Sequence, residues 1–417
     1  MKARRIGGGV CAAAGAVWLV AAQPAAKPPS HDWPQFRGAN RDGVSQEAGL
    51  LGAWPAEGPR QVWRVPLGPG FSAISVVGQR LYTMFAGDRE GQATEFAAAF
   101  DAASGKEIWR TPIGKRFDDT FGNGPRSTPT VQAGKVYVLG SYGDLAALSA
   151  VDGAVEWRVS LTEAFASKVP TFGFSTSALV DDGLVVIEGG GKEGKCYAGL
   201  DAATGQVRWT FGNGTDEPGY SSPIAITMGG AKRYVYVVGD SMKAIDGQGA
   251  EIWSHPWTHP GETHAMPVFI PPDRIFASGA EGVGASLLRL TMNGEVSAAE
   301  ELWKTRSMRN HFSSSVVHGG SIYGFDNATL RCISLASGEA AWSQRGLGKG
   351  SLILAGDRLY VLSDLGKLVL VEATPAGYHE RGSVQALQGR SWTAPALANG
   401  RIYLRNHDQM VSYELKR

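Results

Sequence analysis

Three histidines stand out as candidate metal ligands in the segment that runs from residue 254 to residue 264. His255, His259 and His264 lie four and five residues apart, with Glu262 among them. Imidazole nitrogens and carboxylate oxygens are ligands for zinc and other transition metals. The spacing does not place them on one face of a helix, and two prolines stiffen the segment. We therefore expect a polar loop without a bound metal, and we keep the three histidines as the candidate ligands.

Tryptophan recurs along the chain at the end of a short string, as in Asp101-Ala-Ala-Ser-Gly-Lys-Glu-Ile-Trp109. Successive copies are 39 to 52 residues apart, a spacing typical of propeller blades. A residue that occurs once per repeat serves the packing between repeats, and burying one indole stabilises the fold by about 2–3 kcal/mol. These structural anchors are Trp63, Trp109, Trp157, Trp209, Trp253, Trp303 and Trp342.

Each repeat contains four short stretches that are typical of β-strands. In one copy, residues 127–131 open the unit, a turn at 133–135 follows, and residues 136–139 form an apolar, β-branched stretch. The opening stretches number eight, the seventh unit lacks its Trp, and the eighth has no closing strand. The strand around Trp63 (residues 60–67) has no repeat before it and can fill that place. We predict an all-β, eight-bladed β-propeller of four-stranded antiparallel blades, in which the N-terminal Trp63 strand joins the C-terminal blade and closes the ring.

The residue before each opening strand is expected at the mouth of the central channel, at the same height in every blade. Five of these residues are aromatic and three are basic or imidazole. Such a ring could stack on and hold an anionic or planar ligand, or a peptide. In the other interpretation, the aromatic side chains plug the channel or cover the blade tops. The candidate channel-mouth residues are Phe71, Arg126, Phe174, Tyr220, His264, Phe312, Lys349 and Trp392.

The repeated string A-x-D-x-x-[ST]-G-x-x-x-W, best kept at residues 99–109 and in the copy that ends at Trp209, resembles the tryptophan-docking motif of PQQ-like (quinoprotein-type) repeats. The resemblance covers most of residues 60–417 and rests on repetition. Residues 31–43 look like the N-terminal lead-in of secreted proteins with such repeats. We expect Trp33 and Phe36 to pack on one face of the ring.

The resemblance implies one of two kinds of function. Quinoprotein dehydrogenases bind pyrroloquinoline quinone (PQQ) with Ca²⁺ and oxidise alcohols or sugars, whereas BamB-like members bind a protein partner and no cofactor. This chain has no adjacent cysteine pair, no C-x-x-C-H haem motif, and no set of acids spaced as Ca²⁺ ligands. We therefore predict a non-catalytic, BamB-like binding or scaffold protein without a cofactor. The alternatives are a PQQ-dependent dehydrogenase, a quinone-binding sensor, and a carbohydrate-binding propeller.

The N-terminus has the pattern of a signal peptide. Lys2, Arg4 and Arg5 precede an apolar stretch of small residues that ends near Ala22. An uncleaved anchor is the alternative interpretation, and the sequence before Cys11 is a poor match to a lipidation site. We predict a signal peptide at 1–26, a lead-in at 27–59, a propeller domain at 60–417, and export to the periplasm or the cell exterior, with membrane association if the N-terminus stays uncleaved or is lipidated.

The charges are balanced, at 40 basic and 39 acidic residues, so the chain lacks the basic field that nucleic-acid binding needs. We expect a monomer that binds a protein partner or a small ligand at one face of the ring. After the signal peptide, Cys196 and Cys332 remain. The repeat count puts them about three blades apart, whereas a disulfide needs Cα atoms within about 7 Å. We predict two unpaired, buried thiols.

Overall fold

The computed structural model describes Met1 and residues 31–416, apart from residues 213–218, 239–240, 258–262, 281 and 294. Met1–Ser30 and His31–Arg417 form separate units, and the fold described below is that of the second unit. The predicted signal peptide therefore lies outside the described residues, except for Met1. Within the described part of the chain, no helix is both long and apolar enough to cross a membrane.

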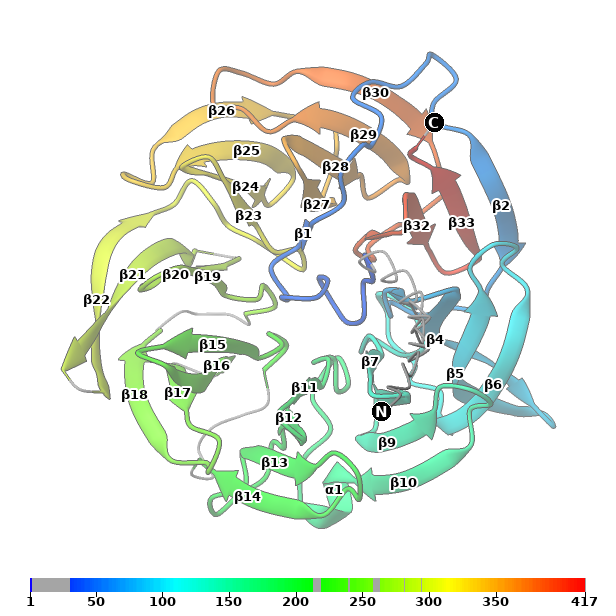
Figure 1. The fold of residues 1–417 in the computed structure, drawn as a ribbon, viewed down its shortest axis with the longest axis vertical. Coiled ribbons are helices and arrows are strands. Elements are labelled where there is room, and N and C mark those ends of the chain that lie inside the picture. The colour runs from blue at the N-terminus through cyan, green and yellow to red at the C-terminus, as the bar shows by residue number, and fades with distance from the viewer. Residues whose placement is uncertain are drawn as a thin grey trace. The chain divides into compact units, whose positions relative to one another are not determined.

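Eight antiparallel sheets follow one another around a central axis, which confirms the predicted eight-bladed propeller (Figure 1). The first blade is β3 (Ser75–Val77), β4 (Arg80–Arg89), β5 (Gln92–Asp101) and β6 (Glu107–Lys115). The second is β7 (Thr130–Gln132), β8 (Lys135–Leu139), β9 (Asp144–Ser149) and β10 (Val155–Ser160), followed by the short helix α1 (Leu161–Ala164). The third is β11 (Leu179–Asp181), β12 (Leu184–Glu188), β13 (Tyr197–Asp201) and β14 (Val207–Phe211). The fourth is β15 (Ile224–Met228), β16 (Ala231–Val238), β17 (Ser241–Ile245) and β18 (Glu251–Pro256).

The remaining blades repeat this order. The fifth is β19 (Val268–Ile270), β20 (Arg274–Gly279), β21 (Gly284–Asn293) and β22 (Glu295–Thr305). The sixth is β23 (Val316–His318), β24 (Ser321–Asp326), β25 (Thr329–Ser334) and β26 (Ala340–Gln344). The seventh is β27 (Ser351–Ala355), β28 (Arg358–Leu362), β29 (Lys367–Glu372) and β30 (Glu380–Gln385). The eighth is β31 (Ala396–Ala398), β32 (Arg401–Arg405) and β33 (Gln409–Glu414) with β2 (Gln61–Pro66).

The ring is closed by pairing between the two ends of the propeller. Strand β2 lies antiparallel to β33, with Trp63 opposite Ser412. The last blade therefore takes three strands from the C-terminus and its outer strand from the N-terminal part, as predicted. Because the two ends pair in this way, the last blade has four strands and β33 is not left as an open sheet edge.

The tryptophan anchors hold each blade to the next one. The indole Nε1 of Trp63 donates to the carbonyl of Ala102 at 3.0 Å, and that of Trp157 to Ala202 at 3.1 Å. The glycine of the next repeat packs on the ring: a Cβ on Gly205, whose φ is +73°, would lie 2.7 Å from Cε3 of Trp157. The repeated string therefore forms a contact between blades, because the indole of one blade packs where the turn of the next blade has a glycine without a side chain.

The Asp of the same string fixes the turn. The Oδ1 of Asp201 accepts hydrogen bonds from the backbone N–H and the hydroxyl of Thr204, at 2.8 and 2.9 Å. A hydrogen bond from Arg208, together with those from Thr204, lowers the pKa of Asp201 to about 2. The Asp and the Ser/Thr are thus the parts of the motif that shape the turn, while the Gly and the Trp dock the blades.

The lead-in first crosses the middle of the ring in the view of Figure 1 and, after β1 (Val44–Ser45), runs outward past the seventh and eighth blades to β2. Trp33 is buried and exchanges two backbone hydrogen bonds with Val76 of the first blade, each 2.8 Å long. Strand β1 adds to β27 of the seventh blade in parallel, and Leu51 N–H donates to Leu415 of the eighth. The segment therefore connects the first, seventh and eighth blades.

The two cysteines of the propeller are both buried thiols, as predicted. Cys196 precedes β13 and Cys332 lies in β25, three blades further along the chain.

Candidate binding cavity

A cavity of about 510 Å³ lies where the segments before the innermost strands meet, and we call it the central cavity. Seven of the eight predicted channel-mouth residues line it. They include Arg126, Tyr220, Lys349 and Trp392, which were expected to face one cavity. The side chains that line it are mostly aromatic rings and hydroxyls, with Arg37, Arg126, Lys349 and Asp119 as the charged groups among the described residues. The seven predicted residues are Phe71, Arg126, Tyr220, His264, Phe312, Lys349 and Trp392.

The register of the innermost strands explains why these residues meet. In the first blade, Phe71 stands four positions before Ser75, which pairs with Tyr82 of the next strand. In the last blade, Trp392 stands four positions before Ala396, which pairs with Tyr403. The same four-residue offset from the equivalent ladder position leads to each of the seven residues. Equal offsets in an eightfold repeat place the side chains at one height.

Phe174 is the exception, because it is not among the residues that line the cavity. In the third blade the equivalent ladder residue is Leu179, so the offset leads to Ser175, which lines the cavity. A shift of one residue along extended backbone turns a side chain to the opposite side. Phe174 accordingly points between blades, is 3% exposed, and packs in a cluster with Leu161 and Phe165.

Aromatic rings in mutual contact encircle the cavity, and we call them the aromatic collar. Trp392 and Phe312 have centroids 5.1 Å apart, and Tyr220 stacks on His264 at 4.9 Å with an interplanar angle of 13°. Further contacts link His264 to His311, His311 to Phe312, Phe172 to Tyr220, Phe121 to Phe172, and Phe121 back to Trp392. The collar consists of Phe71, Phe121, Phe172, Tyr220, His264, His311, Phe312 and Trp392.

Three collar residues were missed by the sequence analysis. Phe121, Phe172 and His311 come from the connections before β7, β11 and β23, outside the repeated offset. Phe121 and Phe172 each precede a glycine with positive φ, Gly122 or Gly173, in loops longer than a tight turn. An aromatic residue followed by glycine in a long loop is the signal that could have identified Phe121 and Phe172, whereas His311 carries no such signal.

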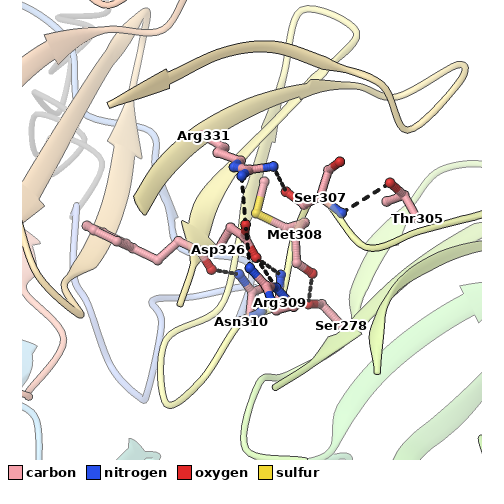
Figure 2. A network of polar contacts seen from close by, with 9 residues as sticks. Ser278, Thr305, Ser307, Met308, Arg309, Asn310, Asp326 and Arg331 are labelled. Atoms are coloured by element: carbon pink, nitrogen blue, oxygen red, sulfur yellow. Dashed lines mark hydrogen bonds and ion pairs between the residues drawn. The ribbon is translucent and has the colours of Figure 1, made fainter. Parts of the chain in front are cut away.

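A buried polar network holds the loop that carries His311 and Phe312 (Figure 2). Asp326 is 3% exposed, and its carboxylate is 2.6 Å from Nε of Arg309 and 3.0 Å from a guanidinium nitrogen of Arg331. The amide of Asn310 donates to the carbonyl of Phe325 at 2.9 Å, and its backbone N–H donates to the hydroxyl of Ser278. Because these bonds hold Arg309 and Asn310, the two residues before His311, the rings of His311 and Phe312 are presented on a fixed backbone.

A second layer of side chains, two residues closer to the strands than the collar, consists of hydroxyls. Each accepts a hydrogen bond from a backbone N–H of the preceding blade, so it also links neighbouring blades. We call Thr128, Ser177, Ser222 and Ser314 the hydroxyl layer. All four line the central cavity. The bonds run from Ala73 N–H to Thr128 at 3.0 Å, Thr128 N–H to Ser177 at 2.9 Å, Ser177 N–H to Ser222 at 2.8 Å, and Met266 N–H to Ser314 at 2.9 Å.

Arg37 of the lead-in bounds the cavity next to the hydroxyl layer. Its guanidinium donates to the carbonyls of Ser314 and Ser315 of the sixth blade, at 3.1 and 2.6 Å, and to those of Asp42 and Arg41. Burial lowers the pKa of Arg37 to about 10, with the Asp42 carboxylate acting in the opposite direction. The guanidinium therefore keeps its positive charge at neutral pH.

Arg126 belongs to the opposite, aromatic part of the wall. Its guanidinium donates to the carbonyls of Gly122, at 3.0 Å, and Gly124, and it lies 3.7 Å from the carboxylate of Asp119. It also lies 5.3 Å from the ring centroid of Phe71. Burial lowers the pKa of Arg126, and the carboxylates of Asp119 and Glu95 oppose that shift. The loop that presents Phe121 is thereby pinned to the collar.

The predicted histidine cluster is not brought together within the described residues. His264 belongs to the collar, whereas His255 lies in β18, the outer strand of the fourth blade. His259 falls outside the described residues. Among the residues that the structure does describe, no group of three or more His, Cys, Asp or Glu is placed to hold a metal ion.

Comparison with known proteins agrees with the fold and the repeat motif. A family model described as outer membrane protein assembly factor BamB matches residues 93–344, more than half of the chain. A search of curated proteins gave no match. Among solved structures, BamB from Moraxella catarrhalis is similar, with a TM-score of 0.63 and 15% identity over 86% of this chain and 98% of that one.

Two further structures share the architecture. Quinohemoprotein alcohol dehydrogenase from Comamonas testosteroni has a TM-score of 0.63 and 14% identity over 92% of this chain and 80% of that one. The computationally designed Ika8 protein has a TM-score of 0.57 and 11% identity over 88% of this chain and all of that one. At these identities the structures show a common fold, and it is the family model that assigns membership. With its PQQ-like repeats, this chain belongs to the family of the outer membrane protein assembly factor BamB.

Proposed function

We propose that this chain is a non-catalytic binding protein of the cell envelope, and that the central cavity with its aromatic collar is its binding site. The observation that carries the proposal is the convergence of eight aromatic side chains, five from mouth positions of five blades and three from longer connecting loops, on one cavity of about 510 Å³. That volume lies within the range of about 300–1,000 Å³ of small-ligand pockets. A rigid ring that presents flat side chains is suited to holding a partner group without changing it.

The family supports a scaffold role, since its model is described as that of an assembly factor. The proposal includes export of a monomeric chain with residues 1–26 as a signal peptide, the lead-in at 27–59 and the propeller at 60–417. It also includes a protein partner or small ligand at the collar face of the ring and no nucleic acid.

The alternative function, quinone-dependent oxidation, requires a site for PQQ with Ca²⁺. Ca²⁺ takes six to eight oxygen ligands, among them several carboxylates. Of the described residues that line the cavity, Asp119 is the one carboxylate, and Arg126 lies 3.7 Å from it. The sequence also has no adjacent cysteines. The residues present do not fit this group, and the proposal contains no quinone chemistry.

Affinity capture from envelope extracts tests the proposal with three forms of the full chain. Trp392→Ala removes a collar ring that contacts three other collar residues. Val151→Ala changes an exposed apolar residue in a turn outside the cavity. We expect a partner that is retained by wild type and by V151A. Its affinity for W392A should be at least about thirtyfold lower, because losing a central aromatic contact costs about 2 kcal/mol or more. Equal retention by W392A would place the binding site elsewhere, and no enriched partner would contradict the scaffold role.

A further inference from the structure

The hydroxyl layer presents unused hydrogen-bond donors to the central cavity. A hydroxyl has one proton to donate and two lone pairs that accept. In Thr128, Ser177, Ser222 and Ser314 the oxygen accepts a backbone N–H of the neighbouring blade. Among the described residues, no hydrogen bond uses the protons of these four hydroxyls, which are between 2% and 4% exposed. The accepted N–H bonds hold each hydroxyl oxygen in place. An acceptor that enters the cavity can then take the hydroxyl protons in hydrogen bonds.

The charged groups around this layer favour a negatively charged acceptor. The buried guanidinium of Arg37 makes its four hydrogen bonds to neutral carbonyl oxygens. Lys349 and Arg126 also line the cavity, and Asp119 opposes them with one negative charge. The described residues that line the cavity thus carry three cations and one carboxylate. The carboxylates of Asp42 and Glu95 also act on Arg37 and Arg126, but they do not line the cavity, and burial raises the pKa of both. In a partly buried site, the cations interact far more strongly with an anion than they would in water.

The collar adds a preference for a flat group at a defined distance from the anion. The mouth residues and the hydroxyl layer are two residues apart along extended backbone, which corresponds to about 7 Å. An aromatic ring held among Trp392, Phe312 and Tyr220 would therefore leave an attached acidic group near the hydroxyls. Stacked and edge-to-face contacts with the collar suit an aromatic ring better than an aliphatic one.

We infer that the ligand of the central cavity is a small aromatic acid, with its carboxylate hydrogen-bonded in the hydroxyl layer and its ring held by the aromatic collar. This inference rests on the proposed function, because it takes the central cavity to be the binding site. It adds the chemical class of the ligand, which the fold family leaves open.

Two matched probes test the inference by isothermal titration calorimetry on the full chain. N-acetyl-L-tryptophan carries a carboxylate, and N-acetyl-L-tryptophanamide has the same ring and nearly the same size without the charge. We expect the acid to bind at least about tenfold more tightly than the amide, because hydrogen bonds to an ionised acceptor are stronger than those to a neutral one.

Paired variants locate the carboxylate. Thr128→Val removes one hydroxyl at nearly constant volume, and Thr128→Ser keeps it. Lys349→Met removes one positive charge of the wall, and Lys349→Arg keeps it. We expect the acid-to-amide affinity ratio to fall at least about threefold in T128V and K349M, and to stay close to wild type in T128S and K349R. Because the ratio is taken within each variant, a general loss of stability or of ring binding does not imitate the result.

Three outcomes would overturn the inference. Equal affinities of the acid and the amide for wild type would show that the cavity does not select an anion, while leaving the proposed binding function intact. A ratio that is unchanged in T128V and K349M would place the carboxylate outside the hydroxyl layer. If neither probe bound at millimolar concentration, the ligand class would be wrong, and the capture experiment with W392A would decide the proposed function independently.

Discussion

Glu188 shows what a single buried acid does in this fold. It is the last residue of β12, is 1% exposed, and accepts one hydrogen bond, from Gly219 N–H at 3.0 Å. Its Oε1 has no partner among the described residues. Burial raises the pKa of Glu188 well above its ordinary value of 4.5. The folded protein therefore holds a proton on this carboxyl at pH values where the unfolded chain has released it.

The pH dependence of stability follows from that difference. As pH rises above about 4.5, the unfolded chain loses the proton first, so wild type loses stability with a slope of about 1.4 kcal/mol per pH unit until the folded carboxyl also titrates. Glu188→Gln keeps the hydrogen bond from Gly219 and cannot titrate. We expect the two proteins to have similar melting temperatures near pH 4 and E188Q to be the more stable one at pH 8, with thermal unfolding as the measurement.

The control for this prediction is Glu90→Gln, which changes an exposed acid in the turn between β4 and β5. E90Q and wild type should show parallel pH profiles. If the E188Q profile is also parallel to wild type between pH 4 and pH 8, Glu188 is ionised in the folded protein, and the stabilising partner of its carboxylate has still to be found.

At this scale, sequence identified most of the cavity because its residues obey a repeat. Counting along the strands leads to seven of the eight residues proposed for the mouth. It does not lead to Phe174, because the equivalent ladder position of that strand lies one residue later than the serines before the strand indicate. The hydroxyl layer is also periodic, yet serine and threonine before a strand carry no sign of whether they face a channel or a neighbouring blade. The pairing of Asp326 with Arg309 and Arg331 could not be predicted, since these residues stand 17 and five positions from Asp326 and follow no repeat.

At the scale of elements, the contact between a tryptophan and the next glycine turn can be tested with two glycines of the third blade. Gly205 and Gly183 have φ values of +73° and +75°. A Cβ on Gly205 would lie within 2.7 Å of Trp157, whereas a Cβ on Gly183 would meet nothing within 4 Å. Alanine adds the same backbone strain at both positions, about 1–2 kcal/mol, and adds a clash at Gly205 alone.

We expect Gly183→Ala to lower the free energy of unfolding by about 1–2 kcal/mol and Gly205→Ala to lower it by at least twice as much, measured by urea denaturation. The difference between the two variants is the contribution of the tryptophan docking. Equal losses in G205A and G183A would mean that the glycine is conserved along the repeat for its backbone conformation alone, with no role in docking.

The lead-in is the element that sequence could not place. It has no counterpart in the repeat, and its links to the blades are backbone bonds and guanidinium-to-carbonyl bonds, which leave no pattern in the sequence. Arg37 reaches the sixth blade, Arg41 donates to the carbonyls of Ser177 and Ala178 of the third at 2.8 and 3.1 Å, and Phe36 packs on the cluster between the fourth and fifth. The resemblance of residues 31–43 to a lead-in is visible in the sequence, but the contacts of this segment with several blades are not.

For the whole molecule, the ring depends on two contributions from the N-terminal part, the closing strand β2 and the lead-in. They can be separated by truncated chains that begin at His31, Arg60 and Gly68. The chain from His31 keeps both. The chain from Arg60 keeps β2 on β33 and loses Trp33 and Arg37. The chain from Gly68 loses β2 as well, which leaves β33 as an open edge and empties the place of Trp63 beside Ala102.

We expect the chain from His31 to be monomeric with the full stability of the propeller. The chain from Arg60 should stay monomeric and lose at least about 3 kcal/mol, because a buried tryptophan and the guanidinium bonds to several blades are removed together. The chain from Gly68 should associate, because an unpaired strand edge is a template for another chain. Size-exclusion chromatography with light scattering and urea denaturation give both readouts. A monomeric Gly68 chain as stable as the Arg60 chain would show that blade packing alone holds the ring closed, and that β2 covers an edge without joining the two ends.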